Sequence, residues 1–185
     1  FSVIIDRHDP DPSRRYKMVY RYLTPLPAMK ALGTTTATSA DGIHWKPFGR
    51  VQMPAILDIG HFFYDPLQRK YAVYGRLWAH RRQVQLAYSD DFKSWTKPYL
   101  VADINDQDPP GTQLYSLAVH VDGGQYIGLS QLYTRGTSHL LEFELAASRD
   151  GRTWKRVHQG ETFLPCGGHG EWDRFNNSIS SNPVR

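Results

Sequence analysis

Apolar and polar residues alternate in short runs along this chain, and no apolar pattern of helical period extends over any length. Runs rich in Tyr, Val, Ile and Phe, such as RYKMVY, KYAVYGR and QYIGLSQLY, each follow a turn of Asp, Pro or Gly residues. Such runs are typical of β-strands joined in hairpins. The pattern therefore predicts a chain that is nearly all β.

One short phrase occurs three times, as SADGIHW at 39–45, SDDFKSW at 89–95 and SRDGRTW at 148–154. Each copy ends a longer phrase of three strand-like runs, which indicates a repeated supersecondary unit. The Ser and Asp side chains can bond backbone groups in a tight turn, where Gly42 and Gly151 permit a positive φ. Trp45, Trp95 and Trp154 would then begin a fourth strand and pack against the neighbouring unit.

Four short antiparallel strands per unit, with an aromatic wedge between units, describe a propeller blade. We therefore expect an all-β propeller of four-stranded antiparallel blades, as a single partial domain over 1–185. The expected blades cover roughly 1–50, 56–100 and 112–160, and a further blade begins at 167–185. Because closed propellers have about four to eight blades, we expect remaining blades or an additional chain segment to close the ring.

Composition and charge narrow the possible partners. The net charge of +4 on 185 residues is dispersed, with Arg doublets only at 14–15 and 81–82, whereas a nucleic-acid footprint needs a concentrated basic stripe. No stretch approaches the roughly 20 apolar residues of a membrane span. No signal-peptide pattern is present, but the chain begins at Phe1, so its location stays open among secreted, periplasmic and cytoplasmic. We expect neither a nucleic-acid partner nor a membrane partner.

The sequence contains no pattern typical of a metal site or of a catalytic thiol. The single cysteine, Cys166, has no partner for an internal disulfide and no His at a catalytic spacing. No His, Cys and Asp residues occur at metal-ligand spacing. The sequence therefore predicts no metal and no cofactor.

Acidic residues recur just ahead of the innermost strand of successive units, as Asp58, Asp108 and the pair Glu171 and Asp173. Equivalent positions of successive blades converge on the central channel of a propeller. Two carboxyl groups meeting there could cleave a glycosidic bond, one protonating the leaving oxygen and the other serving as nucleophile or base. A turn-forming role is the alternative for Asp58 and for Asp108, since Asp is common in loops.

Five further residues are candidates for binding a sugar near the channel mouth, namely His61, Arg76, Trp78, Tyr115 and His169. Arg76 could clamp a carboxylate or a sugar hydroxyl, and a surface salt bridge is its alternative role. Trp78 and Tyr115 could stack on a sugar face, although an aromatic residue in a blade can equally belong to the core.

The combination RYKMVY, SADGIHW, FFYDPLQRKYAVYGR, AYSDDFKSW, LAASRDGRTW and GEWD resembles the five-bladed β-propeller glycoside hydrolases of families 32, 43 and 68. The resemblance is closer to the bacterial proteins described as family 32 N-terminal-like. It implies a carbohydrate substrate, Asp58 as one of two catalytic aspartates and Glu171 of GEWD as the acid. The WMNDPNG-like and RDP motifs of family 32 are absent, so fructan specificity is not implied.

These features favour a glycoside hydrolase that acts through carboxylates facing the channel. The alternative is a non-catalytic propeller that binds carbohydrate or protein through the same channel. The two hypotheses differ in one observable, because only the hydrolase would turn over a bound sugar.

Overall fold

The structure is a computed structural model that describes residues 1–23, 31–56, 58–78, 80–134 and 140–179. Its strands form three four-stranded sheets, each with neighbouring strands antiparallel and in sequence order. The first contains β1 (Ser2–Ile5), β2 (Tyr16–Leu23), β3 (Ala31–Ser39) and β4 (Lys46–Pro47); the second contains β5 (Asp58–Asp65), β6 (Lys70–Trp78), β7 (Arg82–Ser89) and β8 (Tyr99–Ala102); the third contains β9 (Thr112–Asp122), β10 (Gln125–Thr134), β11 (Leu141–Ser148) and β12 (Lys155–Arg156).

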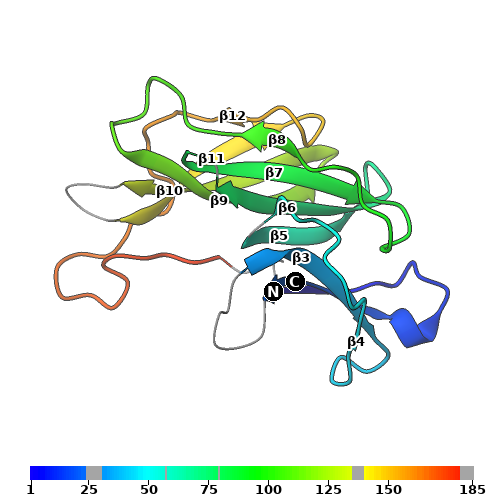
Figure 1. Ribbon diagram of the computed structural model, residues 1–185. Coiled ribbons are helices and arrows are strands. Elements are labelled where there is room, and N and C mark those ends of the chain that lie inside the picture. The colour runs from blue at the N-terminus through cyan, green and yellow to red at the C-terminus, as the bar shows by residue number, and fades with distance from the viewer. Residues whose placement is uncertain (24–30, 57, 79, 135–139, 180–185) are drawn as a thin grey trace.

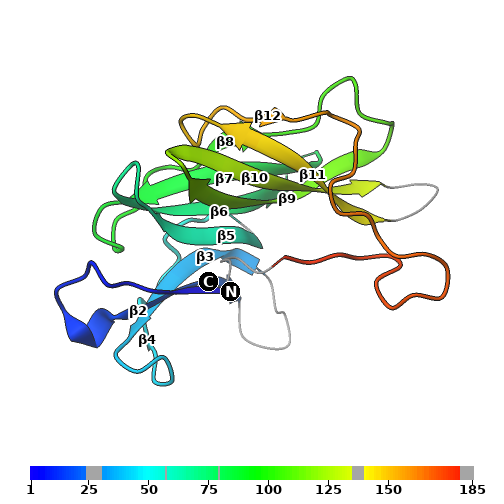
Figure 2. The ribbon, with the colours of Figure 1, turned by 180° about the vertical axis from the view of Figure 1, so that it is seen from behind.

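The three sheets stack one on the next along the molecule (Figures 1 and 2), with β5 in contact with both β1 and β9. They are blades of a propeller, and β1, β5 and β9 are their inner strands. The predicted all-β propeller of four-stranded antiparallel blades, with about three blades present, is confirmed. The only helix among the described residues is η1 (Pro12–Arg14). The described part of the chain contains no helix that is long and apolar enough to cross a membrane.

Two apolar clusters hold the blades together. The first lies between the first and second blades and includes Val19, Phe62 and Phe92. The second lies between the second and third blades and includes Tyr74 and Leu117. Alternate residues of β6 supply the two clusters, with Tyr71 and Val73 in the first and Ala72 and Tyr74 in the second, as expected for blades that pack face to face.

The repeated Ser-x-Asp phrase forms the same turn in all three blades. In the third, Ser148 Oγ accepts a hydrogen bond from Gly151 N at 2.9 Å, and Asp150 Oδ1 accepts from Arg152 N and Thr153 N at 2.8 and 2.7 Å. These backbone bonds lower the pKa of Asp150 to about 2. Gly151 has a φ of +70°, so the predicted turn mechanism is confirmed.

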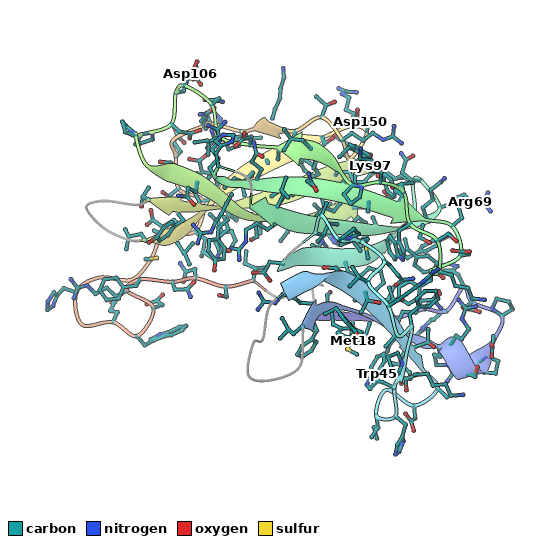
Figure 3. All side chains as sticks on the ribbon, in the orientation of Figure 1. Met18, Trp45, Arg69, Lys97, Asp106 and Asp150 are labelled. Atoms are coloured by element: carbon teal, nitrogen blue, oxygen red, sulfur yellow. The ribbon has the colours of Figure 1, made fainter. Side chains whose placement is uncertain are left out.

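The tryptophans that end these phrases differ in their packing. The ring of Trp154 packs edge-on against Tyr74 of the second blade and Tyr126 of its own blade, at centroid distances of 6.1 and 6.4 Å. Trp95 borders the first cluster. Trp45 lies on the outer turn of the first blade, away from the second (Figure 3). The predicted inter-blade wedge is therefore seen most directly at Trp154.

An Asp–Tyr hydrogen bond ties each described blade to the next. Tyr71 of β6 donates its hydroxyl proton to Asp6 Oδ2, one residue beyond β1. Likewise, Tyr126 of β10 donates to Asp65 Oδ2, at the end of β5, at 2.9 Å. Both acceptors are buried. Asp6 and Asp65 are therefore structural residues at the two blade junctions.

We expect Tyr126→Phe to lower the free energy of unfolding by about 1–3 kcal/mol, because Asp65 would lose a buried donor. The matched control is Tyr16→Phe, since Tyr16 pairs with Ile5 just as Tyr126 pairs with Val121. No described residue bonds the Tyr16 hydroxyl, so this control should change stability by less than about 0.5 kcal/mol. Urea unfolding curves measure both values, and equal losses would contradict the inter-blade role.

Candidate functional site

A cavity of about 180 Å³ opens where the second and third blades meet, beside the starts of β5 and β9. Three of the predicted site residues, Asp58, Arg76 and Tyr115, line it. The rest of its lining is Ser116, Ala118, Gln131, Phe143, Ser178 and Ile179. Strands of two blades and the segment that follows β12 thus bring a carboxylate, a guanidinium, hydroxyls, an amide and aromatic rings to one cavity.

Asp58 is the first residue of β5 and lies opposite Arg76 of β6 in the strand register. Arg76 Nη2 donates a hydrogen bond to Asp58 Oδ2. The Asp58 side chain is 38% exposed and that of Arg76 is 15% exposed. The carboxylate therefore reaches solvent at the cavity while the guanidinium is held beneath it.

The local backbone explains why Asp58 lies there. The pairing of β5 with β6 shifts register between Ile59 and His61, and such β-bulges re-aim the neighbouring side chains. Gly75, next to Arg76, leaves room for the chain that enters β5. A Cβ at Gly75 would lie 2.2 Å from Ile56 Cγ2 and 3.0 Å from the Asp58 backbone oxygen.

We therefore expect Gly75→Ala to destabilise the protein by about 1–3 kcal/mol, through overpacking against Ile56 and displacement of the start of β5. Lys70→Ala is the control, because Lys70 lies on the same strand and its side chain is 39% exposed. Thermal and urea unfolding give the two stabilities. A Gly75→Ala variant as stable as the parent would show that the segment ahead of β5 moves freely.

The ring of Tyr115 in β9 makes cation–π contacts with two arginines of the second blade. The Arg76 Cζ lies 4.2 Å from the ring centroid, and the Arg82 Cζ lies 5.2 Å from it. The ring also meets Tyr133 edge-on at 6.4 Å. Cation–π contacts of this kind stabilise both partners, so Tyr115 fixes the guanidinium that holds Asp58.

The structure does not bring Asp108 to this cavity. Its side chain is 3% exposed, and Oδ2 accepts from Arg156 Nη2 of β12 at 2.5 Å. Arg156 also pairs with Glu144 of β11 at 3.2 Å. Burial would raise the pKa of Asp108, but the Arg156 guanidinium outweighs it and the pKa lies below its usual range. Asp108 attaches the linker ahead of β9 to the outermost strand of the third blade.

His61 lies inside the protein rather than at the cavity. It is 2% exposed, its Nδ1 accepts from Val119 N at 2.9 Å, and its ring stacks on Phe63 at 5.0 Å. Burial lowers the pKa of His61 to about 3, so the ring is neutral at physiological pH. His61 therefore joins the inner strands of the second and third blades.

Glu171, His169 and Asp173 lie outside the cavity lining. The Glu171 carboxylate accepts from Gly168 N at 2.7 Å within its own loop. His169 is exposed in that loop, and Asp173 is half-buried there, its backbone oxygen 3.4 Å from Gly167 N. The Trp78 side chain lies outside the described part of the structure.

Sequence reasoning missed the polar residues of the third blade and of the segment after it. Ser116 and Gln131 are partners in the β9–β10 register, and Ser178 lies far beyond both in sequence. The one signal in the sequence was a polar Gln inside the apolar run QYIGLSQLY. Among the described residues, no group of His, Cys, Asp and Glu is placed to hold a metal ion.

Comparison of the structure with solved structures shows the fold. It is similar to an endo-arabinase from Bacteroides thetaiotaomicron, with a TM-score of 0.61 and 18% identity over 83% of this chain and 59% of that chain. It is also similar to a sucrose-6-phosphate hydrolase from Lactobacillus gasseri, with a TM-score of 0.57 and 16% identity over 81% of this chain and 33% of that chain.

A third similar structure is an N-acetylgalactosamine deacetylase from F. plautii, with a TM-score of 0.54 and 16% identity over 94% of this chain and 72% of that chain. This chain thus spans less than two thirds of the length of the arabinase and of the sucrose-6-phosphate hydrolase. No protein-family model matches the chain, and no curated protein matches it in sequence. At these identities the likeness shows a propeller fold that is shared with glycoside hydrolases.

Proposed function

We propose that the protein is a glycoside hydrolase that acts at the Asp58 cavity without a cofactor. The observation that carries the proposal is the Asp58 carboxylate, which is fixed by Arg76 and open to a cavity with hydroxyl, amide and aromatic lining. Carbohydrate recognition uses this combination of planar polar groups and ring faces. The fold shared with an endo-arabinase and a sucrose-6-phosphate hydrolase adds support.

Asp58 suits the role of the carboxylate that faces the reacting sugar ring. Oδ2 accepts a hydrogen bond from Arg76, so this oxygen is engaged as an acceptor. Cleavage of a glycosidic bond develops positive charge on the sugar ring, which a nearby carboxylate stabilises or captures as a nucleophile. Asp58 would serve in that role, and a second carboxyl group would protonate the leaving oxygen.

Glu171 is the candidate for that second group through its place in GEWD. In the structure its carboxylate caps the loop at Gly168. To act as the acid, Glu171 would have to exchange this bond for the glycosidic oxygen, with Asp173 as the neighbouring alternative. The proposal therefore requires a movement of the 167–173 loop toward the cavity when substrate binds.

A screen of the whole chain against aryl α- and β-glycosides and unlabelled oligosaccharides tests the proposal. Release of the aryl alcohol or of a shorter sugar, above the rate without protein, is the expected result. Calorimetry with the same sugars reports binding independently of turnover. Absence of turnover across the panel would contradict the hydrolase.

One observation favours a second candidate, a propeller that binds carbohydrate without cleaving it. Among the described residues, Asp58 is the only carboxylate that lines the cavity, whereas hydrolysis uses a pair. This candidate predicts sugar binding in the calorimeter and no product in the screen.

We also propose that further blades, or another chain segment, cover the open faces of the first and third blades. Asp122 ends β9 as Asp65 ends β5, yet Asp122 is exposed and no described residue bonds its carboxylate. Ile127 on the outer face of the third blade is 39% exposed. Sedimentation velocity tests whether a second copy of this chain provides the cover, because association would then depend on concentration and weaken in Asp122→Ala. A stable monomer at all concentrations would contradict cover by a second copy.

A further inference from the structure

Residues 175–179, which we call the wall segment, form one side of the Asp58 cavity. The wall segment follows the third blade and runs back toward the second (red in Figure 1). It makes backbone hydrogen bonds of 3.0 and 3.2 Å with Leu141 at the start of β11. Ser178 and Ile179 come directly after these bonds and line the cavity. The third blade thus holds the wall segment just before it reaches the site.

Gln131 connects the wall segment to the strands beneath it. Its side-chain Nε2 donates to the backbone oxygen of Asn177 at 2.7 Å. At the other end of the same amide, Oε1 accepts from Ser116 Oγ at 2.8 Å. Both ends of the amide are engaged by protein groups, so Gln131 acts as a tie between β9 and the wall segment.

Gln131 is buried and lies beside an irregularity in the strand pairing. The residue is 6% exposed, and an amide buried to that extent costs stability when its polar atoms lose their partners. The β9–β10 pairing shifts register between Gln131 and Leu132, so a β-bulge lies beside the tie. A second bulge lies beside Asp58 in β5. A β-bulge therefore lies on each side of the cavity, one beside Gln131 and one beside Asp58, and such bulges re-aim the neighbouring side chains.

We propose that Gln131 is a positioning residue for carbohydrate binding, which holds the wall segment so that Ser178 and Asp58 line the same cavity. The carbohydrate part of this inference rests on the proposed function. The placement of the wall segment does not, because it can be measured without a ligand. Gln131 takes no part in bond cleavage and affects how well a sugar fits beside Asp58.

Hydrogen exchange on the whole chain, without ligand, tests the placement. In Gln131→Met the Asn177 amide, which donates to Leu141 O, should exchange about tenfold faster than in the parent. Gln131→Glu keeps an acceptor for Ser116 but loses the donor, and should show the same acceleration. Gln125→Met, an exposed position on the same strand, should leave exchange in 175–179 unchanged. Unchanged exchange in both Gln131 variants would overturn the inference.

Sugar binding tests the consequence. For a glycoside that the protein turns over, Gln131→Met should raise KM about fivefold to tenfold while kcat stays within about twofold, since Asp58 and Arg76 are untouched. For a sugar that is bound without turnover, Kd should rise by the same factor. Ser178→Ala should weaken binding without accelerating exchange at Asn177. Faster exchange with unchanged KM or Kd would overturn the positioning role, whereas failure of the parent to bind any sugar would instead contradict the proposed function.

Discussion

Asp58→Asn is expected to lower kcat by about 10²–10⁴-fold for any glycoside that the protein cleaves. The change removes the negative charge that would stabilise the reacting sugar and keeps the size of the side chain. The amide oxygen can still accept from Arg76, so the pairing of β5 with β6 should persist. Initial rates and circular dichroism of both proteins check the two parts of this expectation.

Asp103→Asn provides the matched control. Asp103 also accepts a hydrogen bond from an arginine of the second blade, with 2.8 Å between its Oδ2 and Arg81 Nη2, but it does not line the Asp58 cavity. Its kcat should stay within about twofold of the parent. A folded Asp58→Asn protein that retained full turnover would remove Asp58 from the mechanism. Sugar binding by both variants, with no turnover by the parent, would favour the binding propeller.

Lys17→Met is expected to lower the free energy of unfolding by about 3–5 kcal/mol, the effect of breaking a buried ion pair. The Lys17 side chain is fully buried, and its Nζ lies 2.9 Å from Asp6 Oδ2 and 2.6 Å from Asp9 Oδ2. The same Nζ lies 5.5 Å from the ring centroids of Tyr71 and Phe92. Methionine fills a similar volume but leaves the buried Asp6 carboxylate without its cation. Asp9 would keep a cation in Arg14, whose Nε lies 3.3 Å from Asp9 Oδ2.

The loss of stability in Lys17→Met should depend on pH, because Lys17 lowers the pKa values of Asp6 and Asp9. Burial would raise the pKa of Asp6, but hydrogen bonds from Tyr71 and Lys17 outweigh it, and the folded pKa lies below its usual value. Burial would likewise raise the pKa of Asp9, but the hydrogen bond from Lys17 outweighs it, and the pKa of Asp9 also lies below its usual value. A group with a lowered folded pKa stabilises the protein above its unfolded pKa of about 4, and this contribution is lost as the pH falls. The difference between the parent and Lys17→Met should therefore be largest near neutral pH and shrink below about pH 4.

Lys70→Met is the control for Lys17. Lys70 pairs with Asp90 at 3.1 Å, but the two side chains are 39% and 76% exposed. Exposed pairs contribute about 0–1 kcal/mol, so urea unfolding should barely change. Equal losses in the two variants would show that the Lys17 cluster does not behave as a buried network.

The blades and their turns could be predicted because their causes are local. The Ser148 and Asp150 side chains bond amides within three residues of themselves, so the phrase carries its own turn wherever it occurs. Strand alternation has a period of two and appears directly in the apolar pattern. The role of Asp6, by contrast, depends on Lys17 and on Tyr71 of the next blade, which are not its neighbours in sequence.

The candidate site was predicted in part, and the reasons differ from residue to residue. Asp58 and Arg76 meet across a single hairpin, so the position of each in its strand was informative. Asp108 occupied the equivalent place ahead of β9, yet Arg156, 48 residues further on, binds it at the outermost strand. Sequence position alone does not distinguish these outcomes, because both aspartates are acids ahead of an inner strand.

The amino-acid pattern was therefore enough to predict the strands, the Ser-x-Asp turns, the all-β propeller and the place of Asp58 ahead of an inner strand. The partners of the charged groups became visible only in the folded protein. Tyr115 reaches Arg76 from the next blade, and Gln131 reaches Asn177 46 residues away. Such contacts depend on strand register and on bulges, which arise only when the blades pack, whereas hydrogen bonds within a turn form between neighbours in sequence.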